Sequence, residues 1–284
     1  MSSQTFRSRL FKIITHGVTA CGGATVSYYF INQSKDGENI LSISETTPST
    51  KWDYNWDKLD PVSLVKPLQS TDDPKKENKY NEELEKHKSK ATRHIILIRH
   101  GQYFYGSKSD AERILTPLGR QQAELTGQRL KALDLPYDSL IHSTMTRAIE
   151  TAAIIHKHIP NVPISSCPLL EEGAPYPPEP PLSHWKPERS QYFRDGARIE
   201  AAFRKYFHRA LPSQKEDSYE IIVCHANVIR YFVCRALQYP PEGWLRISLC
   251  HASLTLLSIS PSGSVHINAL GDTGFMPIQS ITHV

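Results

Sequence analysis

Two arginines and two histidines in this sequence have the side-chain types that phosphoryl transfer requires: Arg99, His100, Arg147 and His225. A transferring phosphoryl group carries charge on three equatorial oxygens, and planar guanidinium groups match these oxygens well. A neutral imidazole nitrogen can attack phosphorus and form a phosphorylated enzyme, which replaces one difficult displacement by two easier ones. We therefore predict His100 as a nucleophile and the two arginines as phosphate-binding residues. This chemistry requires no metal ion or other cofactor.

Phosphomonoester cleavage also requires a carboxylic acid, because the leaving alkoxide must be protonated. Glu171 and Glu172 are adjacent in the loop that follows Leu170. Either side chain could donate the proton if its pKa is raised beside the nucleophile. The residue types alone do not select between them.

Two predicted strands end at the histidines. Residues 93–99 form an apolar run that ends in Arg99 and His100, which is typical of a strand buried on both faces. Residues 219–224 form a second apolar run directly before His225, and a helix is predicted after it. Residues just beyond the carboxyl ends of strands face ligands in open α/β sheets. Both histidines are therefore expected at one rim of a sheet.

Helices and strands alternate along the rest of residues 91–284. Hydrophobic periodicity and turn residues predict the following elements: a helix over 116–133, a strand over 139–142, a helix opened by Thr144 with Arg147 in its first turn, a proline-rich loop over 169–185, a helix over about 190–210, a helix over 228–237, and a hairpin around residues 260–263. This alternation predicts a three-layer α/β/α sandwich with a mainly parallel sheet.

The first 90 residues differ in composition from the rest. Residues 13–34 carry no charge and follow Arg7, Arg9 and Lys12, which predicts a membrane anchor or a mitochondrial targeting segment over residues 1–35. Residues 36–90 are predicted as a linker that ends in a charged helix.

The predicted linker contains two Trp-Asp pairs four residues apart. We call these residues the Trp-Asp motif: Trp52, Asp53, Asn55, Trp56 and Asp57. Aromatic residues in a polar tether need a partner surface. We interpret these residues as an interaction motif; the alternative is that they pack on their own domain.

Composition excludes several classes. The net charge of +4 is not accompanied by a Lys/Arg run interleaved with aromatic residues, so no nucleic-acid partner is predicted. The five cysteines contain no C-x-x-C pair, which argues against a disulfide framework and against structural zinc.

Four segments, in this order, resemble the motifs of the histidine phosphatase (phosphoglycerate mutase-like) superfamily: Leu97-Ile98-Arg99-His100-Gly101, residues 115–123, residues 147–152, and Cys224-His225-Ala226-Asn227. Further segments resemble a mitochondrial protein-phosphatase branch of that superfamily: residues 52–57, 171–175, 183–187, 195–201 and 271–277. One departure is that many members have glycine at the positions of Cys224 and Ala226, so the loop around His225 is expected to be less flexible here.

The resemblance implies a role for each site residue. His100 would become phosphohistidine, Arg99 and Arg147 would hold the phosphate, and His225 would complete the pocket. It implies Glu172 as the proton donor, because the family's acid immediately precedes the glycine of this loop.

The resemblance also implies a biological setting. It implies a metal-independent phosphatase that acts on phosphoserine and phosphothreonine in proteins, is anchored in a mitochondrial membrane (the outer one is favoured) by one N-terminal segment, and assembles through the Trp-Asp motif. A stress-responsive MAP kinase kinase kinase is the implied partner.

Three alternatives remain at this point. Cys224 and Arg230 have the C-x5-R spacing of cysteine-dependent phosphatases, although the loop lacks glycine and Tyr231 follows where Ser or Thr is expected. A mutase or small-metabolite phosphatase of the same fold is disfavoured because residues 102–113 lack the Ser-x-Trp-Asn sequence of mutases. A non-catalytic scaffold is disfavoured because it would not need the predicted phosphate-binding residues.

Overall fold

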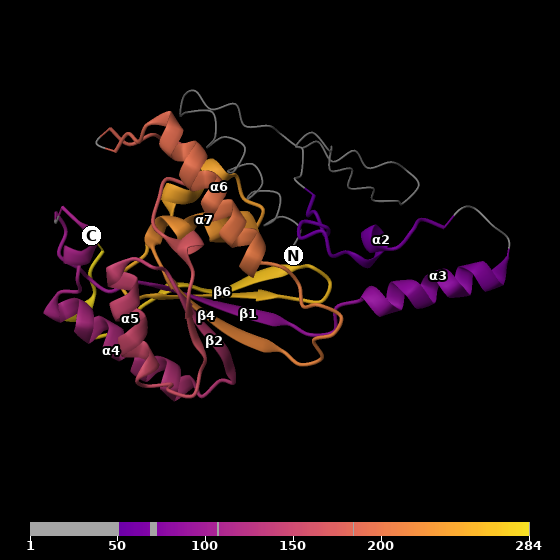
Figure 1. Ribbon diagram of the computed structural model, residues 1–284, viewed down its shortest axis with the longest axis horizontal. Helices are drawn as coiled ribbons and strands as arrows, with labels where there is room; N and C mark the ends of the chain where they lie inside the picture. Colours follow the sequence, from indigo (N-terminus) through magenta and orange to yellow (C-terminus); the bar gives the residue numbers. More distant parts are fainter. Residues whose placement is uncertain (1–50, 69–72, 107, 184, 284) are drawn as a thin grey trace, which may run out of the picture. The chain divides into compact units, whose positions relative to one another are not determined.

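The computed structural model describes residues 51–284, apart from 69–72, 107, 184 and 284 (Figure 1). The segment predicted over residues 1–35 and the start of the predicted linker lie outside these described residues. Residues from Lys51 onward form one compact unit. Among the described residues, no helix has the length and apolar character needed to cross a membrane.

Six strands in the described part of the chain form one sheet, in the order β3-β2-β4-β1-β5-β6. Their bounds are β1 (Arg93–Arg99), β2 (Tyr137–His142), β3 (Ile164–Ser166), β4 (Ser218–Cys224), β5 (Leu254–Ile259) and β6 (Val265–Asp272). The first four strands run parallel to one another, whereas β5 is antiparallel to β1 and β6 is antiparallel to β5. The predicted mainly parallel sheet is thus confirmed.

Helices cover both faces of the sheet. Helices α4 (Pro117–Leu133) and α5 (Thr146–His156) lie on one face, and α6 (Arg189–Tyr206) and α7 (Ala226–Ala236) lie on the other (Figure 1). Side chains of β1 alternate between the two cores: Ile95 and Leu97 pack with α6 and α7, and Ile96 and Ile98 pack with α4 and α5. A fully buried strand must be apolar on both faces, which explains the continuous run in the sequence.

The remaining elements are short or peripheral. They are α2 (Pro61–Leu64), α3 (Pro74–His87), and the 3-10 turns η1 (Asp110–Glu112), η2 (Pro168–Leu170), η3 (Pro241–Arg246) and η4 (Ile278–Ser280). Helix α3 buries none of its residues, in agreement with the predicted charged helix.

Two predicted helix boundaries differ from the structure. The helix predicted to open at Thr144 begins at Thr146, because the Thr144 hydroxyl donates to the Glu171 carboxylate and Met145 occupies the N-cap position. The helix predicted to reach about residue 210 ends at Tyr206, where Phe207 adopts an extended conformation. Neither difference moves Arg147 out of the first turn of α5.

The Trp-Asp motif packs on its own domain. The Trp56 indole N–H donates to the Gly263 carbonyl at 2.8 Å, and its ring lies 5.9 Å from that of Phe203. The Asp57 carboxylate pairs with the Arg209 guanidinium at 2.9 Å, and both side chains are buried. This is the alternative that the sequence left open, and self-association through the motif stays a prediction.

The remaining residues of the Trp-Asp motif form hydrogen bonds and packing contacts that stabilise its backbone conformation. Main-chain groups of Asp53 exchange two hydrogen bonds with the Gln238 side chain, at 2.8 and 2.9 Å. Asn55 accepts from the backbone N–H of Asp60 at 3.1 Å, and Trp52 packs against the core. The motif is therefore a compact turn on the domain.

Candidate active site

His100 lies directly beyond β1 and its side chain is buried. Its Nδ1 lies 2.8 Å from the Gly101 carbonyl oxygen and must therefore carry the proton, so Nε2 is the nitrogen with the free electron pair. Nε2 accepts a hydrogen bond from Nε of Arg147 at 3.1 Å. Burial, followed by the charges of neighbouring groups, lowers the pKa of His100 well below its usual range. A neutral ring with Nε2 unprotonated has the form that nucleophilic attack requires.

Arg147 is held beside this nitrogen by its own neighbours. It lies in the first turn of α5, and its guanidinium carbon is 4.7 Å from the centroid of the Tyr103 ring. Asp110 approaches its Nη1 at 3.4 Å and also accepts from the backbone N–H of Thr146 at 2.9 Å. The guanidinium is thus fixed by an aromatic face and a carboxylate.

Arg99 is the second cation near His100. It ends β1, and its Nη1 donates to the backbone carbonyls of Leu249 and His283, both at 2.6 Å. Its Nη2 lies 3.1 Å from Nε2 of His251, and its Nε is buried with no partner among the described residues. Burial lowers the pKa of Arg99 to about 10, so the side chain remains charged at neutral pH.

His225 faces His100 from the N-cap of α7, with ring centroids 5.1 Å apart. Its Nε2 lies 2.8 Å from the Ser143 hydroxyl, which accepts from the backbone N–H of Met145 and can donate its own proton to this ring. That arrangement leaves Nδ1 as the N–H, and this buried atom has no partner among the described residues. Burial and the nearby arginines, Arg147 first, lower the pKa of His225 well below its usual range.

The two glutamates have different surroundings. Glu171 accepts from the Thr144 hydroxyl at 2.5 Å. Burial raises the pKa of Glu172, although Arg147 and Arg99 act in the opposite direction. Both arginines are therefore close enough to interact with Glu172 electrostatically. A carboxyl whose pKa is raised, beside the two arginines predicted to bind phosphate, is the arrangement expected of a general acid.

Helix α6 fixes the loop that carries Glu172. Arg198 donates to the carbonyl oxygens of residues 169, 171 and 172, at distances from 2.6 to 3.1 Å. Asp195 accepts from the backbone N–H of Ala174 at 3.0 Å. A Cβ atom at Gly173 would lie only 2.7 Å from Arg198 and 2.8 Å from Asp195, so the loop can lie this close to the helix only with glycine there.

The cysteine alternative finds no support in the geometry. Cys224 is fully buried, and burial raises the pKa of its thiol, whereas a nucleophilic cysteine needs a lowered one. Arg230 donates to the Asn227 side chain at 3.2 Å, and Asn227 in turn donates to the Gly173 carbonyl at 3.0 Å. Arg230 is thus linked to the loop of Glu172.

Several residues of this site were not predicted from the sequence. Ser143 directly follows β2, so the rule used for the two histidines could have found it. His251 precedes β5, an antiparallel strand whose amino end lies at the same rim, and a rule based on carboxyl ends does not cover it. Tyr103 and Asp110 lie in the segment between β1 and α4, where no periodicity marks them.

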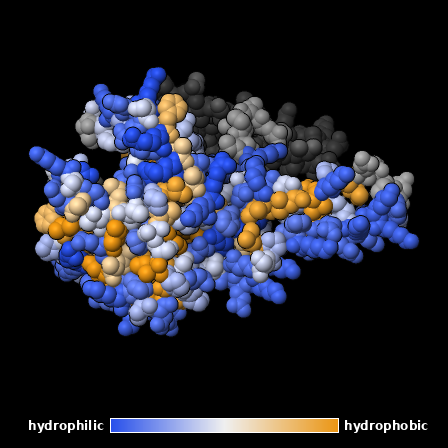
Figure 2. All heavy atoms as spheres, in the orientation of Figure 1, coloured by the Kyte–Doolittle hydropathy of each residue, from blue (hydrophilic) through white to orange (hydrophobic). Residues whose placement is uncertain are grey.

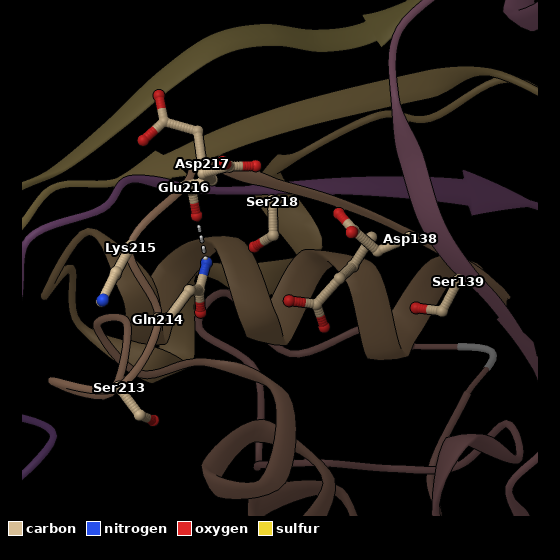
Figure 3. A pocket seen from close by; sticks show the side chains of 9 residues that line it. Asp138, Ser139, Ser213, Gln214, Lys215, Glu216, Asp217 and Ser218 are labelled. Atoms are coloured by element: carbon tan, nitrogen blue, oxygen red, sulfur yellow. Dashed lines mark hydrogen bonds between the residues drawn. The ribbon is translucent and has the colours of Figure 1, made fainter.

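A separate hollow lies at the other end of the strands. Figure 3 shows Asp138, Gln214 and Asp217 among the side chains that line it. These residues adjoin the amino ends of β2 and β4, whereas His100 and His225 lie at the carboxyl ends of β1 and β4. This hollow is therefore not part of the site.

Comparison with known proteins shows which proteins this chain resembles. Curated relatives from Drosophila virilis (55% identical over 273 residues) and Drosophila melanogaster (52% over 272 residues) are named serine/threonine-protein phosphatase Pgam5, mitochondrial. Each comparison covers 93% of this chain and 94% of the relative. The solved structure of YhfR from Bacillus stearothermophilus has the same fold, with a TM-score of 0.51, 21% identity, and coverage of 65% of this chain and all of that one.

The family model that matches describes the histidine phosphatase superfamily (branch 1), and it covers residues 95–175 and 177–273. This match contains the carboxyl ends of β1 and β4, both predicted arginines, and the loop of Glu172 apart from residue 176. The chain belongs to the histidine phosphatase superfamily.

Proposed function

We propose that this protein is a metal-independent serine/threonine-protein phosphatase in which His100 forms a phosphohistidine intermediate. The observation that carries the proposal is a pair of buried side-chain nitrogens without partners among the described residues, Nε of Arg99 and Nδ1 of His225. Arg99 directly precedes His100 at the end of β1, and the His225 ring lies 5.1 Å from the neutral His100 ring. A buried donor left unpaired costs about 1–3 kcal/mol, so a site that keeps two of them suits a ligand rich in acceptor oxygens. A phosphoryl group is such a ligand.

The first half of the proposed reaction transfers phosphorus to the ring. Nε2 of His100 attacks phosphorus while the bond to the serine or threonine oxygen breaks. The Glu172 carboxyl gives its proton to that oxygen, which leaves as the alcohol. Arg147, whose Nε now donates to Nε2 of His100, is placed to bind phosphoryl oxygens once phosphorus occupies that position.

The second half regenerates the enzyme. The ionised Glu172 takes a proton from a water molecule, which attacks the phosphohistidine. The bond between phosphorus and Nε2 breaks, inorganic phosphate leaves, and Glu172 is again protonated. Every group in both halves belongs to the chain, to the substrate or to water.

The relatives support the substrate class and the compartment. Proteins 52–55% identical to this chain carry the name of a mitochondrial serine/threonine-protein phosphatase. We place this protein in mitochondria on that basis, with the segment over residues 1–35 as an anchor in the outer membrane. A stress-responsive MAP kinase kinase kinase is the proposed partner; the resemblance in the sequence motifs is its support.

We further propose self-association through the Trp-Asp motif. Exposed apolar residues follow the motif directly: Val62, Leu64 and Leu68 are 61, 43 and 40% exposed. Figure 2 shows hydrophobic atoms gathered over this segment, beside the hydrophilic surface of α3. An exposed apolar surface next to the Trp-Asp motif, which is itself packed on the domain, is suited to binding another protein chain.

The test compares substrates on the purified full chain. We expect phosphate release from a phosphothreonine peptide with a higher kcat/KM than from 3-phosphoglycerate, and no release by the His100→Ala variant. Preference for the metabolite would favour the small-metabolite alternative. Absence of release from both substrates, with the chain folded and assembled, would favour the scaffold.

A further inference from the structure

We propose that the segment over residues 278–283 positions Arg99 for phosphate binding, with His251 and Thr282 as positioning residues. The inference rests on the proposed role of Arg99 and goes beyond it, because it makes a segment far along the chain part of the site. None of the motifs in the sequence analysis includes this segment.

The guanidinium of Arg99 is held at both of its terminal nitrogens. Nη1 donates to the His283 carbonyl and to the Leu249 carbonyl, both at 2.6 Å. Nη2 lies 3.1 Å from Nε2 of His251. These contacts use three of the five N–H groups of the guanidinium. They leave Nε, which has no partner among the described residues, and one N–H of Nη2 to donate to a ligand.

His251 can accept from Arg99 only as a neutral ring with its proton on Nδ1. Burial and the charge of Arg99 lower the pKa of His251 to about 3, which keeps the ring neutral. Nδ1 lies 2.9 Å from the Thr282 hydroxyl, and the backbone N–H of His251 donates to the Thr282 carbonyl at 2.9 Å. Thr282 therefore fixes both the tautomer and the orientation of the ring that supports Arg99.

A second chain of hydrogen bonds joins the same segment to the nucleophile. Gln122 is fully buried, and its Nε2 donates to the Ser280 carbonyl at 2.7 Å and to the Thr282 hydroxyl at 2.8 Å. Its Oε1 accepts from the backbone N–H of Gln102, two residues after His100, at 2.8 Å. The Thr282 hydroxyl thus accepts from two buried side chains, one on the Arg99 side and one on the His100 side.

Removal of this hydroxyl leaves two buried donors unpaired and frees the His251 ring to turn. We expect weaker phosphate binding with little change in the chemical step, because His100, Arg147 and Glu172 keep their own contacts. Contacts to a charged group of this kind change affinity by about five- to tenfold.

The experiment measures inorganic phosphate as a competitive inhibitor of p-nitrophenyl phosphate hydrolysis by the full chain. Thr282→Val and Thr282→Ala both remove the hydroxyl, and Thr282→Ser is the matched control that keeps it. We expect the inhibition constant and KM to rise about five- to tenfold in the first two variants, with kcat within about twofold, and both to return to the parent values in Thr282→Ser.

Two outcomes would overturn the inference. One is an inhibition constant unchanged in whichever of the two loss variants folds; the other is an equal rise in Thr282→Ser. A purely structural role of Thr282 would lower the melting temperature without changing the inhibition constant. Failure of the parent chain itself to hydrolyse the ester or to bind phosphate would instead contradict the proposed function.

Discussion

At the scale of residues, the site depends on opposite pKa shifts of an imidazole and a carboxyl. Burial lowers the pKa of His100 and raises that of Glu172, which favours the unprotonated form of the nucleophile and the protonated form of the acid. Burial acts in opposite directions on the two groups because it disfavours whichever form is charged. Burial alone therefore favours His100 as the nucleophile and Glu172 as the proton donor.

This pair predicts the pH dependence of kcat on a phosphothreonine peptide. The lowered pKa of His100 keeps the nucleophile neutral as pH falls below the usual range of histidine. The raised pKa of Glu172 means that activity is present while the carboxyl is protonated and is lost as pH rises through that pKa. We expect kcat to decrease on the alkaline side of the profile.

The Glu172→Gln variant tests that assignment. We expect its kcat on the phosphothreonine peptide to fall by about a hundredfold or more and to lose the alkaline decrease. Glu171→Gln is the matched control, because its carboxylate bonds to Thr144. A larger loss in Glu171→Gln than in Glu172→Gln would reverse the assignment of the proton donor.

The sequence predicted which side chains lie at the carboxyl ends of the parallel strands. It did not predict the residues that contact these side chains and fix their orientation. His100, His225 and Arg147 lie where strand and helix ends must meet, so local patterns suffice to locate them. Ser143, Tyr103 and His251 act through long-range contacts that depend on tertiary packing. Selection of Glu172 over Glu171 needed either the resemblance or the structure, since both lie in one loop.

At the scale of elements, helix α6 holds the loop that carries Glu172 in position. Arg198 alone contacts three carbonyl groups of that loop region, those of residues 169, 171 and 172. Arg204, on the same helix, is an exposed cation that pairs with Glu200. Sequence periodicity predicted the helix and its apolar face but ended it about four residues late. The helix ends before Phe207, and Arg209, two residues later, forms an ion pair with Asp57. These two residues are far apart in the sequence, so helical periodicity does not reveal their contact.

Removal of the Arg198 side chain should therefore reduce catalysis more than folding. We expect Arg198→Ala to lower kcat on the phosphothreonine peptide about tenfold or more, because Glu172 loses its fixed position. The control on the same helix is Arg204→Ala, whose exposed ion pair with Glu200 contributes little. Equal activity of the two variants would show that α6 does not position the acid.

At the scale of the whole molecule, the Trp-Asp motif has two possible partners. The structure pairs Asp57 with Arg209 and packs Trp56 near Phe203 within one chain, and the sequence predicted a contact between chains. Sequence patterning shows that the aromatic side chains need a surface, but it does not show on which copy that surface lies. Exposed Val62 and Leu64 next to the motif favour a contact between copies.

The double variant Trp52→Ala with Trp56→Ala tests self-association. We expect a lower mass by light scattering and lower activity, with the circular dichroism of a folded domain. Tyr54→Ala is the control between the two tryptophans, because this side chain is 54% exposed. An unchanged mass in the double variant would mean that the motif acts only within its own chain.

The most direct test of the whole account is to trap the phosphorylated enzyme. Full-length Glu172→Gln, mixed with phosphorus-labelled p-nitrophenyl phosphate, should accumulate label, because the good leaving group needs little protonation while hydrolysis of the intermediate lacks its base. We predict that the label maps to His100, survives alkali, and is absent when His100 is also replaced by Ala. Label on Cys224, or turnover that persists without His100, would contradict the account.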